Sequence, residues 1–271
     1  MTDLHDLLIA GRMLGGSGTP APEPTLITKS IAANGTYSAA DDSADGYSAV
    51  TVNVDSVPVT FLKSIKSLGN SLIITDIVPA YNWKTIMSVK IGAKTSSGSA
   101  GGYIYGSITY DSSNNRIGMY ALGLAVPSAP SYQWSMSYYL GNDWSASNYS
   151  MVINSRDVSN IVPATAKHGE YCTVGSTSKQ INYTAALTDM TQPIGICGKS
   201  SNDQNGAISP YNANEMTFYG IAIFDNSGVK LHDLVPAEHK TTHRGGMYDL
   251  MTGRFYPSHS DYDDFVKEAI T

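Results

Sequence analysis

The chain has 271 residues, a formal net charge of −6 and a charged fraction of 15%, well below the average of about 25% for proteins. No cluster of Lys and Arg occurs along it, which argues against nucleic-acid binding because phosphate neutralisation needs such a cluster. No apolar run approaches the ~20 residues of a membrane-spanning helix, so membrane insertion is not expected either.

Residues 1–24 are predicted to be a docking peptide followed by a linker. The sequence shows a short amphipathic helical pattern, in which the apolar residues are Leu4, Leu7, Leu8 and Met13. A helix this short is unstable alone, so we expect it to bind other proteins or to promote oligomerisation; the alternative is a frayed terminus. Asp3 and Asp6 occupy the place of the basic residues of a signal peptide, so no export signal is expected.

Residues 25–57 are predicted to form a small β-motif. The segment 25–30 is a candidate strand, Ala33 to Thr36 a turn, and residues 47–54 alternate between two faces as a strand does. So few residues cannot build a full core. We therefore expect this motif to pack on copies of itself or on the next domain, which favours a homo-oligomer.

Residues 58–271 are predicted to be one large sandwich. Residues 57–66 read as a connecting strand, and the sandwich proper is expected to begin near Leu68. Short strands follow at regular spacing with almost no helical periodicity, which is typical of sandwiches and jelly rolls. We expect them at 71–78, 85–92, 103–110, 116–124, 133–139, 150–154, 170–174, 179–183, 193–198, 217–224 and 230–235.

The last third of the chain predicts two tight turns and a terminal helix. Asp225-Asn226-Ser227-Gly228 connects two strands, of which the second is expected to stop at Pro236. Asp249 to Gly253 is a second turn between short strands that carry aromatic residues. Residues 261–270 are predicted to form a short helix with Phe265 and Ile270 on one side.

The sequence predicts no catalytic residue and no metal site. Cys172 and Cys197 stand in apolar surroundings, so we expect buried thiols, the alternative being a disulfide between them. A Gly-x-Ser-x-Gly elbow is missing. The histidines 232, 239, 243 and 259 lack the spacing of zinc ligands and are read as loop residues.

Carboxylates give two further alternatives. The groups Asp41/Asp42 and Asp261/Asp263/Asp264, with Glu170 and Glu215, lack the facing pair that a glycosidase needs. Asp111-Ser112-Ser113-Asn114-Asn115 offers hard oxygens in a turn. Calcium is the one cofactor considered there, and a plain hairpin turn is the preferred interpretation.

An aromatic and amide-rich set forms the candidate ligand site. Rings can stack on sugar faces while Asn and Asp bind hydroxyls, and the same mixture suits protein contacts. The alternative is that these rings lie in the core or at a subunit interface. The candidates are Tyr81, Trp83, Trp134, Tyr138, Asn142, Asp143 and Trp144.

Two motifs carry a resemblance to a known family. The segment 216–256, with Phe-Tyr-Gly-Ile-Ala-Ile-Phe-Asp-Asn from Phe218, Asp-Leu-Val-Pro-Ala from Asp233 and Tyr-Asp-Leu-Met-Thr-Gly-Arg-Phe-Tyr from Tyr248, resembles the close of concanavalin A-like, laminin-G-type jelly rolls in bacteriophage tail and fibre proteins. The segment 31–54 is similar to a β-motif of the same proteins, and residues 69–79 loosely resemble the opening strand.

This resemblance implies more than the residues show. It implies an antiparallel jelly roll, a homotrimer, and a place in the virion, reached from the host bacterial cytoplasm, with the N-terminus on other virion proteins. The implied function is adhesion to a bacterial surface glycan or protein. The alternatives are a head fibre or decoration protein of architectural role, and a hydrolase of surface polysaccharide.

Overall fold

A computed structural model describes residues 29–32, 36–39, 50–53, 57–94, 100–126, 133–135, 153–154, 162–167, 170–174, 177–180, 189–202, 208–210 and 214–270. These residues form strands and turns, and none of them lies in a helix. The prediction of an all-β sandwich is confirmed. The helix predicted around Leu4 to Met13 lies outside the described residues.

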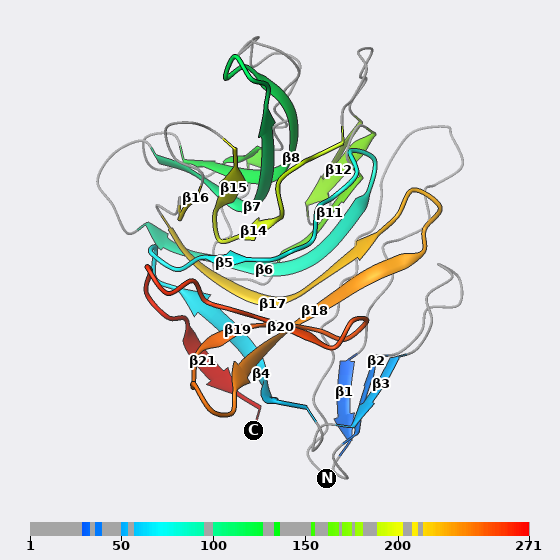
Figure 1. Cartoon of the computed structure of the whole chain (residues 1–271), viewed down its shortest axis with the longest axis vertical. Helices are drawn as coiled ribbons and strands as arrows, with labels where there is room; N and C mark the ends of the chain where they lie inside the picture. Colours follow the sequence, from blue (N-terminus) through cyan, green and yellow to red (C-terminus); the bar gives the residue numbers. More distant parts are fainter. Residues whose placement is uncertain are drawn as a thin grey trace.

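The larger sheet has ten strands in the order β13-β12-β11-β6-β17-β4-β18-β19-β20, with β21 beside β4. Figure 1 shows its central strands β6, β17 and β18 as one curved layer. Its members are β4 (Val59–Ser67), β6 (Lys84–Lys94), β11 (Val162–Lys167), β12 (Tyr171–Val174), β13 (Thr177–Gln180), β17 (Asn214–Phe224), β18 (Lys230–His239), β19 (Gly245–Asp249), β20 (Arg254–Pro257) and β21 (Val266–Ala269).

The smaller sheet has eight strands. Six follow the order β10-β9-β8-β7-β14-β5, and the other two lie off this path, where β15 pairs with both β7 and β16. In Figure 1 its strands β7, β8 and β15 lie above the central strands β6, β17 and β18 of the larger sheet. Its members are β5 (Ile73–Ile74), β7 (Ala100–Tyr110), β8 (Arg116–Val126), β9 (Gln133–Ser135), β10 (Ile153–Asn154), β14 (Gly195–Ile196), β15 (Lys199–Ser201) and β16 (Ile208–Ser209).

The core lies between the two sheets because alternate residues of each strand point inward. In β6 the inward residues are Met87, Val89 and Ile91, and they share one cluster with Tyr105 and Tyr120 of the opposite sheet. Burial of such a side chain stabilises the fold by about 1.5–3 kcal/mol.

A buried polar contact crosses this core. The phenol of Tyr120 and the hydroxyl of Thr85 are hydrogen-bonded, and both residues are buried. Burial raises the pKa of Tyr120 above its usual value, and also that of the neighbouring Tyr105. Both phenols therefore stay neutral, as a buried position requires.

The two cysteines are free and buried, as the sequence predicts. Burial raises the pKa of the Cys172 thiol to about 12, so the reactive thiolate form is suppressed. Cys197 has a positive φ of 60° and begins the turn that connects β14 to β15.

The expectation that the sandwich begins near Leu68 is wrong, because β4 is a central strand of the larger sheet. Residues 65–67 pair with β17, and residues 59–61 pair with β18. The β17–β18 hairpin splays apart and admits β4 between its strands. Buried apolar side chains on both faces of β4, such as Phe61 and Ile65, explain this position.

Two predictions about the last third of the chain are also wrong. Pro236 does not stop β18, which continues to His239. Pro236 stands where the neighbouring strand changes from β17, paired up to Leu234, to β4, paired from Ala237. The strand tolerates the missing N–H there because no neighbour is paired with it on that side.

The predicted helix over residues 261–270 is instead a turn followed by β21, which pairs with β4. Phe265 enters the main core while Ile270 packs against a second cluster under β18 and β19. On the side of β4 that faces β18, residues 62–66 lie beyond the part paired with β18 and are open to β21. The backbone hydrogen bonds formed there outweigh a weak local preference for helix.

Three further strands, β1 (Lys29–Ala32), β2 (Thr36–Ala39) and β3 (Val50–Asn53), form a separate antiparallel sheet in that order. They fall in the segment for which the sequence predicts a small β-motif. β1 begins four residues later than the candidate strand at Thr25. The role of this motif in oligomerisation stays a prediction.

Candidate functional site

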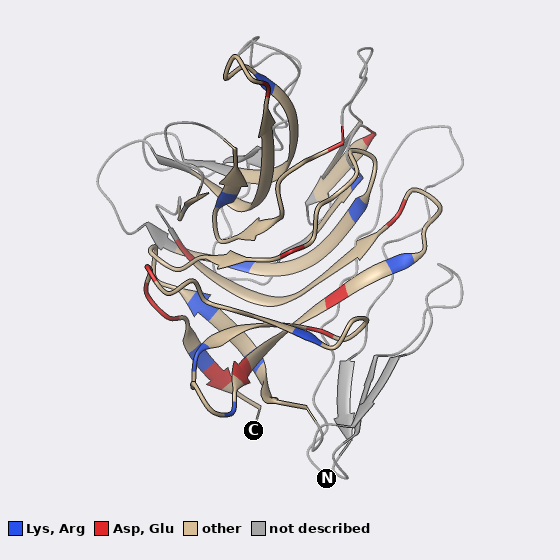
Figure 2. Cartoon of the chain, viewed as in Figure 1, with Lys and Arg blue, Asp and Glu red and all other residues tan. Residues whose placement is uncertain are grey.

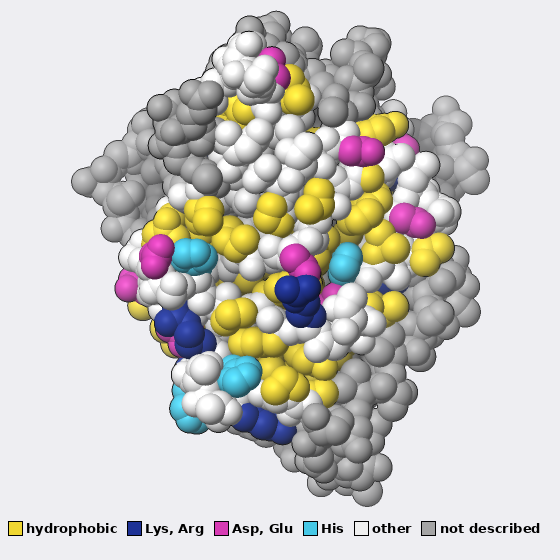
Figure 3. All heavy atoms as spheres, viewed as in Figure 1, with side chains coloured by type: hydrophobic (Ala, Val, Ile, Leu, Met, Phe, Trp, Pro, Cys, Tyr) yellow, Lys and Arg dark blue, Asp and Glu magenta, His cyan; other side chains and the backbone are white. Residues whose placement is uncertain are grey.

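One edge of the sandwich is closed where the last strands of the two sheets meet. Ile73 of β5 forms a bridge with Ser258, which follows β20. Beside this junction lies an open hollow of ≈ 280 Å³. Figure 3 shows this face, with basic and acidic side chains in contact near its centre and hydrophobic side chains around them. The hollow is lined by Asp76, Ile77, Val78, Trp83, His232, Thr252, Arg254 and Tyr256.

Strand β20 supplies two lining residues through its alternation. Arg254 and Tyr256 face the hollow, whereas Phe255 between them packs on the second cluster on the other side. The turn before β20 ends at Gly253, which has a φ of +72°. Glycine adopts this conformation without strain, so the turn can deliver Arg254 directly to the hollow.

The rim of the hollow holds a polar triplet around the Asp76 carboxylate. Arg254 forms an ion pair with one carboxylate oxygen, and the Tyr256 hydroxyl donates to the other at 2.5 Å. Burial raises the pKa of Tyr256, and the hydrogen bond to Asp76 raises it further. The phenol thus remains a donor over the physiological pH range. Arg254 and Asp76 stay half-exposed, with side-chain exposures of 60% and 47%.

The base of the hollow is fixed by a buried carboxylate, Asp249. One oxygen accepts the N–H groups of Asp233 and Met251, each at 3.0 Å, and the other accepts His232 Nδ1 and the Thr252 hydroxyl, each at 2.8 Å. Burial alone would raise the pKa of Asp249, but these donors outweigh it and hold the pKa below its usual value. Asp249 therefore remains charged and orients His232.

An indole ring completes the hollow. The ring of Trp83 lies 6.5 Å from that of His232, between centroids, and is partly buried against the core. The exposed apolar residues Val78 and Met251 stand on or next to the lining. A partly exposed ring beside an Asp, an Arg and a Thr can stack on an apolar face of a ligand and bind its hydroxyl groups.

Of the predicted ligand site, the structure places Trp83 in the hollow. Tyr81 lies in the preceding turn, where its N–H donates to Asp189 at 3.1 Å, and it does not line the hollow. Trp134 belongs to β9, and its side chain lies outside the described part of the structure. Outside the described residues lie Tyr138, Asn142, Asp143 and Trp144, and so do Leu4, Leu7, Leu8 and Met13.

The segment that raises the calcium alternative, residues 111–115, forms a hairpin turn. The Asp111 carboxylate accepts the N–H groups of Ser113 and Asn115 and the side-chain amide of Asn115. Those bonds lower the pKa of Asp111. In the part of the chain that the structure describes, no group of three or more His, Cys, Asp or Glu is arranged to hold a metal ion.

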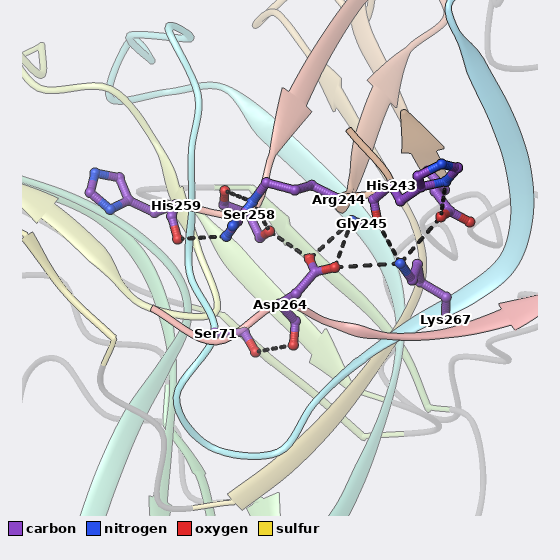
Figure 4. Close-up of polar contacts among 9 residues, drawn as sticks. Ser71, His243, Arg244, Gly245, Ser258, His259, Asp264 and Lys267 are labelled. Carbon is purple, nitrogen blue, oxygen red and sulfur yellow. Dashed lines mark hydrogen bonds and ion pairs between the residues drawn. The ribbon is translucent and has the colours of Figure 1, made fainter. Parts of the chain in front are cut away.

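The acidic cluster near the C-terminus serves a structural role. Asp264 accepts the Gly245 N–H at 2.9 Å and the Ser258 hydroxyl at 2.6 Å, and Lys267 lies 3.5 Å from its other oxygen. Arg244 donates to both Ser258 and the His259 carbonyl. Figure 4 shows these groups converging from β19, β21 and the segment after β20. The network ties the C-terminal segment to the sheet.

Sequence reasoning missed most of the lining. Arg254 and Tyr256 carried a usable signal, since they alternate along a short strand next to a turn and must share a face. The reading of His232 and His239 as loop residues is wrong, since both belong to β18. Asp76 gave no signal, because its role depends on the meeting of β5 and β20.

Comparison of the chain with family models, with curated proteins and with solved structures gave no match. Attribution to a family therefore depends on the two sequence motifs alone. No helix among the described residues is long and apolar enough to cross a bilayer.

Proposed function

We propose that this protein is a binding module of a bacteriophage virion, and that the hollow beside Trp83 holds a hydroxyl-rich glycan of the bacterial surface. The observation that carries the proposal is the juxtaposition of the Trp83 ring with the half-exposed Asp76–Arg254 pair. A pyranose has an apolar face for the ring and vicinal hydroxyls for a carboxylate and a guanidinium. Its hydroxyls can bridge both groups without breaking the pair.

The preorganisation of the hollow supports binding. Asp76 is held by Arg254 and Tyr256, and His232 is held by the buried Asp249. Groups that are already fixed lose little conformational freedom when a ligand arrives. The weak affinity expected of a small open site suits display in several copies, in which avidity multiplies it.

The virion attribution rests on the resemblance of residues 31–54 and 216–256 to tail and fibre proteins. In this proposal the sandwich is of the jelly-roll type, residues 1–24 form a helix that docks on other virion proteins, and residues 25–57 assemble a homotrimer. Measurement of the particle mass in solution checks the last point, since a trimer has three times the chain mass of 28.9 kDa.

Binding to an array of bacterial surface polysaccharides tests the ligand proposal. Trp83→Ala is expected to weaken binding at least about tenfold, because the stacking ring is lost. Tyr171→Ala is the matched control, since Tyr171 is a partly exposed aromatic residue of β12, near the opposite edge of the same sheet from β20. Equal binding by both variants would refute the assignment of the hollow.

The same experiment separates the alternative functions. Release of shorter saccharides from a bound polysaccharide would identify a hydrolase. Absence of binding to every polysaccharide and to host cells would favour an architectural head fibre or decoration protein.

A further inference from the structure

We propose a second ligand site on the outer face of the larger sheet, specific for a carboxylate-bearing sugar. This face is turned away from the core, and it contains a hollow of ≈ 370 Å³ formed by strands β4, β6, β17 and β21. Figure 2 shows charged residues on β4, β18 and β21 of the larger sheet, whereas the smaller sheet carries few. The site is independent of the hollow beside Trp83, with which it shares no lining residue.

The strand register places the polar side chains of this hollow in one row. Thr217 of β17 is paired with Lys90 of β6 on one side and with Lys66 of β4 on the other. Its neighbours Met216 and Phe218 point into the core, so Thr217 and Tyr219 point outward. Adjacent strands are about 4.8 Å apart, so the two lysines flank Thr217 at a spacing that suits one sugar ring.

The partners of these side chains differ in a way that selects a ligand. Lys66 is neutralised by Glu215 at 2.7 Å. Lys90 is a lining amine for which no hydrogen bond or ion pair is present within the described residues, and the hydroxyls of Thr217 and Tyr219 are likewise unused there. One ammonium group and two hydroxyls are thus available to an incoming ligand.

The carboxylates of the hollow are held in place and can accept hydroxyl groups. Glu268 accepts Lys63 Nζ at 2.7 Å and the Ser64 hydroxyl at 2.8 Å. A Cβ atom at position 92 would lie 2.7 Å from Glu215 Cβ, so the glycine there makes room for the Glu215 side chain. These fixed acceptors match sugar hydroxyls, and Lys90 matches a carboxylate.

Other ligand classes fit this composition less well. The centre of a protein interface is depleted of charged residues, whereas four of the nine lining residues here are Lys or Glu. A nucleic acid needs several basic groups along its phosphate backbone, whereas Lys90 is the one lining lysine of this hollow without an ion pair among the described residues. A neutral sugar would leave the Lys90 ammonium without a direct ion pair, with only the more distant Glu268 carboxylate as a counter-charge. A uronic acid residue uses all the available groups.

Titration calorimetry with oligogalacturonate and oligoglucuronate, and with the neutral galactose and glucose oligomers as counterparts, tests this site. The acidic oligomers are expected to bind with an affinity that falls as salt rises. Lys90→Gln should lower that affinity at least about tenfold, since a charge-assisted hydrogen bond is lost. Thr217→Val should lower it less, while thermal melting of both variants checks that the fold is intact.

Two controls make the outcome decisive. Lys167→Gln removes a lysine of β11 in the same sheet that is engaged with Glu170 and lies outside the hollow, and it should change the affinity less than about twofold. Trp83→Ala should leave binding of the acidic oligomers intact, which separates this site from the proposed glycan site. Failure of both acidic oligomers to bind, equal binding of their neutral counterparts, or equal effects of Lys90→Gln and Lys167→Gln would overturn the proposal.

Discussion

Replacement of Asp249 by alanine removes the acceptor of four hydrogen bonds at the base of the hollow beside Trp83. The cost of this loss differs among the donors, because water can replace the carboxylate for some of them and not for others. The N–H of Asp233 lies in a fully buried residue within β18, where water cannot replace the carboxylate. Thr252 and Met251 are exposed, so their groups can turn to solvent.

The cost follows from this difference. A buried N–H left without a partner costs about 1–3 kcal/mol, and each replaceable hydrogen bond contributes about 1 kcal/mol. Asp249→Ala should therefore lower the free energy of unfolding by about 4 kcal/mol, which corresponds to a fall in Tm on the order of 10 °C for a chain of this size. Asp249→Asn should cost only about 1 kcal/mol, because its amide oxygen keeps both backbone donors and its NH₂ group can donate to His232 and Thr252.

Urea denaturation and thermal melting, followed by circular dichroism, measure both changes. Asp225→Ala is the matched control, since Asp225 also closes a turn, accepting Ser227 Oγ at 3.0 Å and Val229 N–H at 2.8 Å, but lies at the surface. A clearly smaller effect is expected there. If Asp249→Ala and Asp225→Ala shift Tm equally, burial does not govern the strength of these turns and the reasoning fails.

Three more predictions concern acid stability, thiol reactivity and the pairing of β21. Because the folded-state pKa of Asp249 is lowered, its contribution to stability is present above the unfolded value of about 4 and is lost as pH falls through the folded pKa; Tm measured from pH 6 to pH 2 should show this loss, and Asp249→Asn should lack that part of it. Cys172 and Cys197 should react with a thiol reagent only after denaturation, when two thiols are titrated, and fast reaction of the native protein would contradict their burial. Asp264→Ala should speed hydrogen exchange in β21 more than in β6, as read by mass spectrometry, because it releases the C-terminal segment from Gly245; unchanged exchange would mean that strand pairing alone holds β21.

The sequence was sufficient for features that depend on neighbours along the chain. Alternating apolar residues predicted β6, β7, β8 and β17 with small errors at their ends, because a strand with one buried face must alternate. The turn at Asp249 to Gly253 was predicted for the same local reason. Its Asp and Gly types meet the hydrogen-bonding and φ requirements of a tight turn.

Features that depend on distant segments were decided by the tertiary structure. The sequence predicts a connector at β4 and a helix at residues 261–270. In the structure, β4 instead lies between the splayed strands β17 and β18, and its remaining edge pairs with β21. The hollow arose in the same way, since Asp76 and Arg254 are 178 residues apart in the chain. Alternation fixes which face of a strand is buried, but it carries no information on which strand lies alongside. The partners of a strand are chosen by packing of the whole sheet, and here that choice brought Trp83, Asp76 and Arg254 to one edge.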